Sequence, residues 1–438
     1  MEQYSDPPRV VVVGGGAGGL ELVIRLAKLR RSHRVAVTLV DQNETHVWKP
    51  LLHEVASGSL YPGNEEVDYA ALAHWHGFTF CHGTFQGLDR EARLVHVAPI
   101  RIDDEIVIPA RSLPYHVVVL AIGGVTRDFG VPGVKEHAYV LDDVQEAEQF
   151  HRQLLNLCLR ANYAPPEARP EGLNVVIVGG GATGVELAAE LRSSIRILTS
   201  YGLENIDPDR FIRITILNLD SRLVPQLPER ISNAITEELG KLDVAVRNSE
   251  QVVAITNDHV ETKSGNRYPA DLVVWAAGVK APDGLKDIGG LETNRLDQLV
   301  VSGTLQSTRD PNVFAMGDCA AAPWIGKKSN VPPRAQAASQ QAQYLAKAIP
   351  RFLAGEDVRP FVYNDLGSFV SLGDENTIGT LMGFISGHSM RIEGFIARTI
   401  YRWLYRRHQA HLFGWGAAIL SSLGTWLRGA TRPRVKLH

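Results

Sequence analysis

Cysteine is scarce in this sequence and forms no motif. Only Cys81, Cys158 and Cys319 occur in 438 residues, and no two of them stand in a CxxC or CxxxxC spacing. This pattern argues against a disulfide framework and fits a reducing compartment. No cluster of metal-ligating residues stands out either, so we predict no metal site.

Long apolar segments are also missing. The uncharged segment 412–427 has only 16 residues, whereas a membrane-spanning helix needs roughly 20. The net charge is −3, which gives the whole chain no bias toward nucleic acid. The charge is uneven, however, because residues 390–438 contain many Lys and Arg and a single acid, Glu393. The length and an ordinary composition, 45% hydrophobic and 21% charged, predict two or three globular domains.

A glycine-rich turn follows the first apolar run of the chain. Residues 9–13 read as a buried strand, 21–31 as an amphipathic helix and 34–40 as a second strand. The GxGxxG pattern between them lets the backbone turn tightly, approach a pyrophosphate and pack the helix close to the strand. Asp41 ends the second strand, where an acid accepts hydrogen bonds from a ribose. The predicted contacts of this first dinucleotide are Gly14, Gly16, Ala17, Gly18, Gly19 and Asp41.

The same pattern returns 165 residues later, after a Pro-rich linker at 161–172. A strand at 173–180 runs into a second glycine turn at 179–184 and a helix, and the run 211–220 reads as a strand that ends in Asp220. An acid there favours NADH, because it would repel the 2′-phosphate of NADPH. Arg222 could instead accept that phosphate, and Asp220 could simply cap the strand. The predicted contacts of the second dinucleotide are Gly179, Gly181, Ala182, Thr183, Gly184 and Asp220.

These repeats predict an α/β fold with two doubly wound, Rossmann-like nucleotide-binding domains and a C-terminal amphipathic helical segment for membrane association. Further buried strands are expected at 117–122, 271–278 and 312–318. The first domain is expected to be discontinuous, at 1–125 and 298–358. The second domain is expected to be inserted into it at 126–297, and a membrane-facing region to follow at 359–438.

Three short segments resemble the FAD/NAD(P) disulfide-reductase superfamily. They are AIGG at 121–124, WAAG at 275–278 and AMGDCA at 315–320. The resemblance implies that the first loop holds FAD, that the second holds NADH, and that Asp318 accepts hydrogen bonds from the ribityl chain. It adds Ala121, Gly123 and Gly317 to the FAD contacts and Ala277 and Gly278 to the NADH contacts. Cys319, next to Asp318, fits a small buried residue.

The absence of a cysteine pair removes the thiol branches of that superfamily, including disulfide reductases and sulfide:quinone oxidoreductases. The segments 46–58, 275–294 and 334–341 then resemble the single-subunit, non-pumping type II NADH:quinone dehydrogenases. Two positions depart from the family pattern: Gly124 stands where Ser is common, and Asp220 stands where Glu is usual.

That resemblance implies an acceptor site at the segment 335–341, beneath the flavin. Ala335, Gln336 and Gln340 are the residues concerned, and the two Gln amides could donate hydrogen bonds to a quinone carbonyl. An ordinary polar helix is the competing interpretation. Glu186 could orient the nicotinamide or deliver protons, or it could be a first-turn helix acid. Lys49 could touch the flavin edge or be a surface residue.

The C-terminal tail predicts contact with a membrane. In 395–407, Arg398, Arg402 and Arg406 share one helical face opposite apolar residues, which suits the headgroup layer. The segment 412–427 would lie along one leaflet, and the basic residues after it would bind anionic lipid. A helix pair that packs on a partner subunit is the alternative, and nucleic acid is the weaker interpretation. The family resemblance implies a homodimer at the cytoplasmic face of the bacterial inner membrane, as a peripheral or monotopic protein.

The sequence therefore predicts a respiratory enzyme that passes a hydride from NADH to FAD and then two electrons to a membrane quinone, ubiquinone or menaquinone, without pumping protons. Two other functions stay open at this point. One is a soluble flavoprotein reductase of a protein such as ferredoxin. The other is a flavin-bound redox sensor with little turnover.

Overall fold

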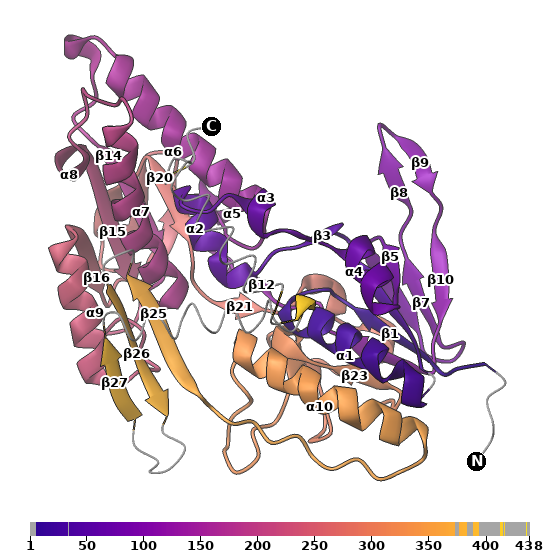
Figure 1. Ribbon diagram of the computed structural model, residues 1–438. Coiled ribbons are helices and arrows are strands. Elements are labelled where there is room, and N and C mark those ends of the chain that lie inside the picture. Colours follow the sequence, from indigo (N-terminus) through magenta and orange to yellow (C-terminus); the bar gives the residue numbers. More distant parts are fainter. Residues whose placement is uncertain are drawn as a thin grey trace. The chain divides into compact units, whose positions relative to one another are not determined.

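The computed structural model describes residues 6–33, 35–372, 376–382, 389–393, 412–414, 416 and 435 (Figure 1). The chain forms two compact units. The first comprises Met1–Trp48, Glu65–Val125 and Val279–Asp365, and the second comprises Lys49–Asn64, Thr126–Gly278 and Leu366–His438. The predicted helix at 395–407 and most of the segment 412–427 lie outside the described residues.

A five-stranded parallel sheet forms the centre of the first unit. Its strands are almost wholly apolar, as expected for a sheet covered on both faces. The strand order is β23-β11-β1-β2-β5, with bounds β23 Val313–Ala315, β11 Val117–Leu120, β1 Arg9–Val13, β2 Ala36–Asp41 and β5 Thr79–His82. Val13 pairs in register with Leu120 and Val40, and Leu120 with Ala315, so the carboxyl ends of four strands meet at one edge. That edge is where such sheets bind ligands.

Two long helices, α1 (Ala17–His33) and α10 (Ala335–Leu353), pack against each other in the first unit (Figure 1). The shorter elements of this unit are small sheets and short helices. Their bounds are β3 Thr45–His46, β4 Val67–Asp68, α4 Tyr69–His76, β6 Phe85–Asp89, β7 Leu94–Val97, β10 Arg111–Pro114, β22 Leu299–Val300, η3 Asp283–Leu285, η4 Ile288–Gly290, η5 Gly317–Cys319 and β24 Ala320–Ala321.

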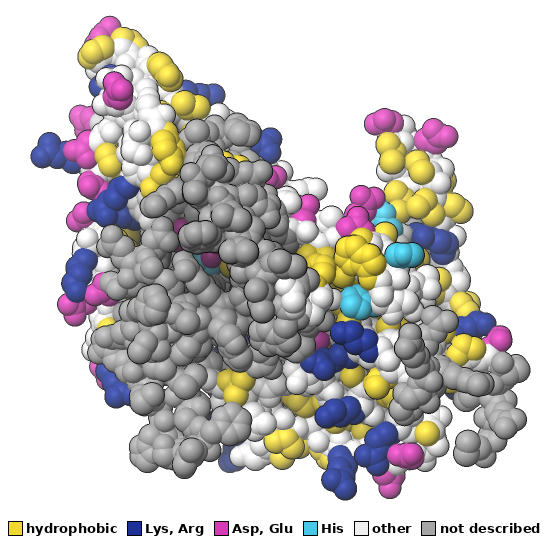
Figure 2. Space-filling model, viewed as in Figure 1, with side chains coloured by type: hydrophobic (Ala, Val, Ile, Leu, Met, Phe, Trp, Pro, Cys, Tyr) yellow, Lys and Arg dark blue, Asp and Glu magenta, His cyan; other side chains and the backbone are white. Residues whose placement is uncertain are grey.

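One hairpin of the first unit, β8 (Ile100–Ile102) with β9 (Glu105–Ile108), carries exposed apolar side chains. Ile102, Ile106 and Val107 are 58%, 49% and 53% exposed. Figure 2 shows acidic side chains at its tip, in line with the exposed residues 103–105. This acidic tip does not suit an anionic lipid surface.

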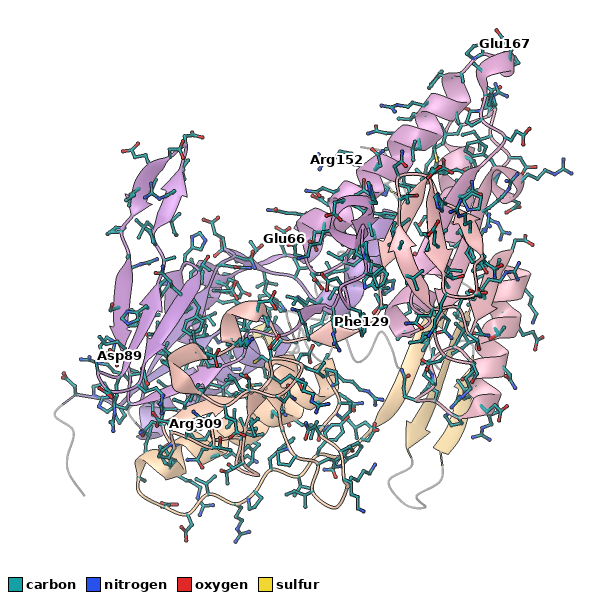
Figure 3. All side chains as sticks on the ribbon, turned by 180° about the vertical axis from the view of Figure 1, so that it is seen from behind. Glu66, Asp89, Phe129, Arg152, Glu167 and Arg309 are labelled. Atoms are coloured by element: carbon teal, nitrogen blue, oxygen red, sulfur yellow. The ribbon has the colours of Figure 1, made fainter. Side chains whose placement is uncertain are left out.

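The second unit repeats the architecture of the first. Its parallel sheet has the order β13-β20-β14-β15-β16, with bounds β13 Ala138–Tyr139, β20 Leu272–Trp275, β14 Leu173–Val178, β15 Ile212–Asn218 and β16 Val244–Asn248. The helices of this unit include α2 Leu52–Ser57, α5 Val134–His137, α6 Val144–Tyr163 (which carries Arg152, labelled in Figure 3), η2 Pro166–Ala168, α7 Ala182–Ser200, α8 Pro208–Phe211 and α9 Glu229–Lys241.

Two antiparallel sheets complete the second unit. One consists of β17 Val252–Ile255, β18 His259–Thr262 and β19 Arg267–Pro269, and the other of β25 Gly367–Leu372, β26 Asn376–Met382 and β27 Ser389–Glu393. The remaining elements among the described residues are η1 Lys49–Leu51, α3 Pro62–Glu65, β12 Val125–Thr126 and β21 Val279–Lys280. Within the part of the chain that the structure describes, every helix is too short or too polar to cross a membrane.

Candidate dinucleotide and acceptor sites

The two glycine loops have the same backbone construction. Gly14 and Gly179 both have positive φ, +101° and +122° respectively. A Cβ atom on Gly14 would lie 2.4 Å from the Ala121 carbonyl oxygen, and one on Gly179 would lie 2.7 Å from the Ala276 carbonyl oxygen. Each first glycine therefore turns the chain beside a neighbouring strand where no larger residue fits.

The second and third glycines of each pattern also correspond. A Cβ atom on Gly19 would lie 1.9 Å from the Gly14 oxygen, and one on Gly184 would lie 2.1 Å from the Gly179 oxygen. These contacts hold the helix start against the strand. A Cβ atom on Gly16 or Gly181 would instead meet nothing within 4 Å. Both loops thus present bare backbone to open space at the start of a helix, which is the construction that a pyrophosphate needs.

The first helix start is closed in from one side by α10. A Cβ atom on Gly18 would lie 3.0 Å from the Ala338 side chain and 2.6 Å from that of Met316. Ala17 begins α1, and the matching residues of the second loop, Ala182 and Thr183, begin α7. All the predicted loop residues therefore lie where the glycine pattern places them.

In the first unit, side chains fix the residue between the first two motif glycines. The Gly15 N–H donates to the Asp41 carboxylate at 2.6 Å, and the Gly15 carbonyl accepts from the Tyr69 hydroxyl at 2.8 Å and from His46 Nδ1 at 3.0 Å. Burial lowers the pKa of His46 to about 4, so its ring is neutral. Burial also raises the pKa of Asp41, while N–H groups of Asn43 and Gly15 oppose that shift. Sequence reasoning missed Tyr69 and His46, because no local pattern connects them to the loop.

In the second unit, a different residue from the predicted one occupies the position of Asp41. The Gly14 N–H donates to the Val40 carbonyl and the Gly179 N–H to the Leu217 carbonyl, so Asn218 corresponds to Asp41. The predicted strand end at Asp220 is wrong, because β15 ends at Asn218. Asp220 lies two residues further on and is exposed.

The AIGG and MGD segments lie beside the first glycine loop, at the carboxyl ends of β11 and β23. Ala121 follows β11 and lies against Gly14, as described above. A Cβ atom on Gly124 would lie 3.1 Å from Asp318 Cβ, and Gly123 has a φ of +82°. Gly317 begins η5, and its N–H donates to Gln341 Oε1 at 2.7 Å. The structure therefore gathers the first loop, the AIGG segment and the MGD segment at one edge of one sheet.

In the second unit, an aromatic ring packs against the end of the WAAG segment. A Cβ atom on Gly278 would lie 2.6 Å from the ring of Phe129, which is labelled in Figure 3. The Arg127 guanidinium stacks over that ring at 4.5 Å, and the Arg127 carbonyl accepts from the Trp275 indole. Ala277 precedes Gly278 at the end of this segment, directly after β20.

The start of α10 carries the predicted acceptor residues. Gln336 Nε2 donates to Asp365 at 3.4 Å, and Arg334 forms an ion pair with the same carboxylate at 3.3 Å. Gln340 has both halves of its amide engaged by one residue: Nε2 donates to the Asn364 carbonyl at 2.8 Å and Oε1 accepts from the Asn364 N–H at 3.0 Å. Gln340 thus anchors the segment that follows the helix. Ala335 is the first residue of α10.

A buried acid joins α10 to α1. Glu21 is 2% exposed and forms an ion pair with Arg25 at 2.7 Å. It also accepts hydrogen bonds from Ser339 at 2.6 Å and Gln343 at 3.3 Å. The glutamate therefore holds the acceptor helix against the helix of the first glycine loop.

Glu186 occupies the corresponding position of the second unit, two residues after Gly184, and is also buried. Its Oε1 accepts from the Ser371 N–H at 3.0 Å, and its Oε2 lies 3.7 Å from His53 Nδ1. Burial raises the pKa of Glu186 to about 8, with the Ser371 bond opposing and the charge of Glu190 adding to the shift. Burial lowers the pKa of His53 to about 4. At neutral pH this site holds a protonated carboxyl group beside a neutral imidazole.

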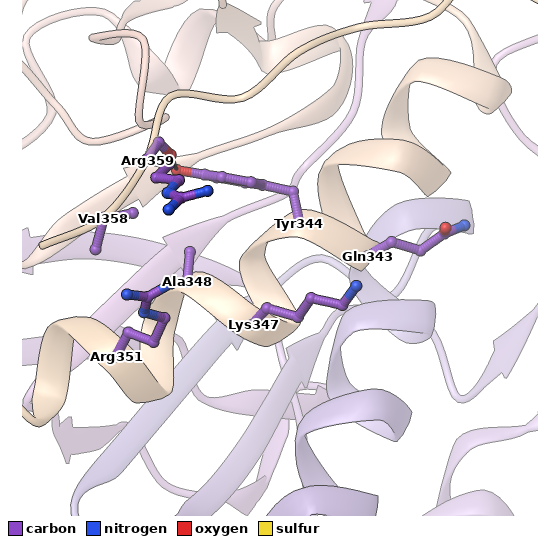
Figure 4. Close-up of a pocket in the computed structure, with 7 residues that line it drawn as sticks. All are labelled: Gln343, Tyr344, Lys347, Ala348, Arg351, Val358 and Arg359. Carbon is purple, nitrogen blue, oxygen red and sulfur yellow. Dashed lines mark hydrogen bonds between the residues drawn. The ribbon is translucent and has the colours of Figure 1, made fainter. Parts of the chain in front are cut away.

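Lys49 and Cys319, also named from the sequence, differ in exposure. Lys49 is exposed at the start of η1 and belongs to the second unit. Cys319 is buried, and burial raises its pKa to about 11, so it is an unreactive thiol. A surface pocket of about 310 Å³ lies along α10, lined by Gln343, Tyr344, Lys347, Ala348, Arg351, Val358 and Arg359 (Figure 4). It contains none of the glycine-loop residues.

Comparison with known proteins gives one consistent answer. A family model described as pyridine nucleotide-disulphide oxidoreductase matches residues 8–342. The type II NADH:quinone oxidoreductase of Haemophilus influenzae is 40% identical over 98% of this chain and 99% of its own length. The enzyme of the same name from Staphylococcus aureus is 29% identical over 86% of this chain and 90% of its own length.

Solved structures agree on the fold. NDH2 from Plasmodium falciparum in complex with NADH superposes with a TM-score of 0.78 at 19% identity and covers 98% of this chain and 100% of that one. The sulfide:quinone oxidoreductase of Aquifex aeolicus has a TM-score of 0.73 at 18% identity and covers 93% and 92%. The chain therefore belongs to the pyridine nucleotide-disulphide oxidoreductase family and, within it, to the type II NADH:quinone oxidoreductases.

Proposed function

We propose that this chain binds FAD on its first glycine loop and NADH on its second, and that it carries two electrons from NADH to a quinone. The observation that carries the proposal is the pair of matching cradles, in which Gly16 and Gly181 each expose backbone to open space at a helix start. FAD held there would supply the redox chemistry, since a flavin can accept a hydride from NADH and pass two electrons to a quinone. The protein supplies binding, orientation and electrostatics.

The first unit suits FAD because its donors and acceptors converge on one sheet edge. The loop from Gly14 to Gly19 would hold the pyrophosphate, and Asp41 the ribose. Asp318, beside Gly124, would accept hydrogen bonds from the ribityl chain. We assign to the FAD site Gly14, Gly16, Ala17, Gly18, Gly19, Asp41, Lys49, Ala121, Gly123, Gly317, Asp318, Ala335 and Gln336, and propose 1–125 with 298–358 as the FAD domain.

The second unit would bind NADH in the same manner, within a domain at 126–297. The N-terminus of α7 offers N–H groups and positive dipole to the pyrophosphate. Besides its glycine loop, Ala277, Gly278 and Glu186 are the proposed contacts. Because Glu186 keeps its proton at neutral pH, it could donate a hydrogen bond or a proton, which an ordinary carboxylate could not do.

Gln336 is our preferred donor to a quinone carbonyl. It lies at the first turn of α10, and its amide has the shared carboxylate of Asp365 as a partner. Gln340 has both halves of its amide engaged by Asn364, so we propose that it positions the segment after α10.

We further propose that the enzyme works as a homodimer at the cytoplasmic face of the bacterial inner membrane. The membrane contact is supported by the sequence of 395–438, in which basic residues flank apolar, aromatic stretches and would bind anionic lipid. The homodimer is what the family resemblance implies. Deleting 395–438 should release the protein from anionic vesicles while the flavin absorbance is kept. Undiminished vesicle binding by the truncated protein would contradict the assignment of membrane contact to this tail.

The central test follows NADH oxidation by the purified flavoprotein with and without a short-chain quinone. Turnover that depends on quinone is expected, and a rate unchanged by quinone would refute the proposal. Gln336→Leu should lower quinone-dependent turnover by about tenfold, while the reduction of FAD by NADH keeps its rate, since one lost hydrogen bond is worth about 1.4 kcal/mol. Gln343→Leu, on the same helix, is the matched control. If both variants lose turnover equally, the effect belongs to the helix and not to Gln336.

A further inference from the structure

The second glycine loop lacks a carboxylate where the first loop has one. In the first unit the residue after Val40 is Asp41, and in the second unit the residue after Leu217 is Asn218; both follow a carbonyl that accepts from the first motif glycine. Asn218 also touches its loop, because a Cβ atom on Gly180 would lie 2.5 Å from Asn218 Oδ1. Position and contact both make Asn218 the counterpart of Asp41, at the strand end where the adenosine ribose of a bound dinucleotide would lie.

The Asn218 amide is held in one orientation. Its Nδ2 donates to the carbonyls of Asp220 and Arg222 at 3.0 Å each and to Asn248 Oδ1 at 2.8 Å. These three acceptors would be lost if the amide rotated, so the neutral Oδ1 stays turned toward the loop. A neutral oxygen can accept a hydrogen bond from a ribose hydroxyl, but it carries no charge to repel a phosphate.

The neighbouring charged residues do not replace the missing carboxylate. Asp220 is exposed, and its backbone carbonyl serves as an acceptor for Asn218. The Arg222 guanidinium donates to the carbonyls of Leu227 and Pro225 and to Ser232 Oγ. It is committed to the loop that leads into α9, so it adds positive charge nearby without being a dedicated phosphate ligand.

We propose that this enzyme accepts NADPH as well as NADH, and that Asn218 is the residue that permits it. The inference rests on the proposed function, because it concerns the electron donor of the same site. A carboxylate within hydrogen-bonding distance of the ribose discriminates against a 2′-phosphate by about a hundredfold through charge repulsion. Asn218 removes that repulsion.

The first experiment uses the wild-type holoenzyme and compares the kcat/KM of flavin reduction for NADPH and NADH. A preference for NADH over NADPH of less than about thirtyfold supports the inference, and a larger preference overturns it. This threshold lies below the discrimination of about a hundredfold that is expected of a carboxylate. Failure of both nucleotides to reduce the flavin would instead refute the proposed function. Competition against NADH by 2′,5′-ADP and by 5′-AMP gives an independent reading, because similar inhibition constants are expected only if the 2′-phosphate is tolerated.

The second experiment compares two substitutions of the same loop. Asn218→Glu should lower the NADPH:NADH ratio of kcat/KM by about tenfold or more, since it restores the repelling charge. Asp220→Asn should change that ratio by less than about twofold, as expected of a remote exposed charge. If Asp220→Asn raises the ratio and Asn218→Glu does not lower it, Asp220 is the discriminating residue and the inference is wrong. Flavin absorbance and Tm identify any variant that has failed to fold.

Discussion

The two glycine loops of this enzyme agree in their backbone and differ in the side chains around it. The first, second and third glycines of each motif meet the same neighbours or the same open space. In the first unit, Tyr69, His46 and Asp41 fix Gly15. In the second unit, the Gly180 carbonyl accepts from the Val224 N–H at 2.8 Å, and a neutral amide replaces the carboxylate.

The same contrast continues one turn into each helix. Glu21 and Glu186 stand two residues after their third glycines, and both are buried. Glu21 is paired with Arg25 and serves as a structural link between two helices. Glu186 faces His53 and a backbone N–H, and burial raises its pKa to about 8. The two units thus share the backbone of the glycine loop, and the side chains around that backbone differ.

The largest effect is expected at the glycines that the two loops share. Gly19→Ala and Gly184→Ala should each destabilise the protein by about 4 kcal/mol, because the new methyl group would overlap a backbone carbonyl that cannot move away. Gly16→Ala and Gly181→Ala are the matched controls, since their methyl groups meet open space. They should keep Tm and lose affinity for FAD and NADH respectively. Equal Tm values for all four variants would contradict the common construction of the loops.

The buried glutamate of the first unit should have the next largest effect. Glu21→Ala should cost about 3 kcal/mol, because it leaves Arg25, Ser339 and Gln343 without their shared acceptor. Glu21→Gln keeps the shape and should cost less. Thermal unfolding of the holoenzyme measures both. A neutral result for Glu21→Ala would show that α1 and α10 are held by apolar packing alone.

The glutamate of the second unit should act through pH. With a folded pKa of about 8 against an ordinary value of 4.5, Glu186 binds a proton in the folded state that the unfolded chain has lost. Its contribution to stability is therefore greatest below about pH 4.5 and is lost as the pH rises through 8. Between pH 6.5 and 8, wild type should lose about 2 kcal/mol more stability than Glu186→Gln. Parallel pH profiles of Tm would contradict the assigned protonation.

The smallest effect is expected when the first loop is made to resemble the second. Asp41→Asn should weaken FAD binding by about tenfold, because a charge-assisted hydrogen bond to Gly15 becomes a neutral one. The affinity can be measured by fluorescence as apoprotein is titrated with FAD. Unchanged affinity would mean that Tyr69 and His46 suffice to hold the loop.

Local pattern was enough to predict much of this molecule. The β-branched runs, the two GxGxxG turns and the helices after them all lie where the sequence placed them. The sequence pattern misplaced the end of β15. Residues 218–220 alternate between polar and apolar, so either Asn218 or Asp220 could end the strand. Pairing with β16, in which Asn218 lies opposite Asn248, decides the matter, and a single-sequence pattern does not contain that register.

By itself, then, the sequence determined the fold class, the two dinucleotide cradles and the family, because these depend on glycine, periodicity and short-range order along the chain. Only the tertiary structure decided which side chains complete each cradle. Tyr69 reaches Gly15 across 54 positions, Gln340 reaches Asn364 across 24, and Glu186 receives the N–H of Ser371 across 185. Such contacts depend on packing between distant segments. That packing also gives Glu21 and Glu186 different partners, although the two glutamates occupy the same place in their motifs.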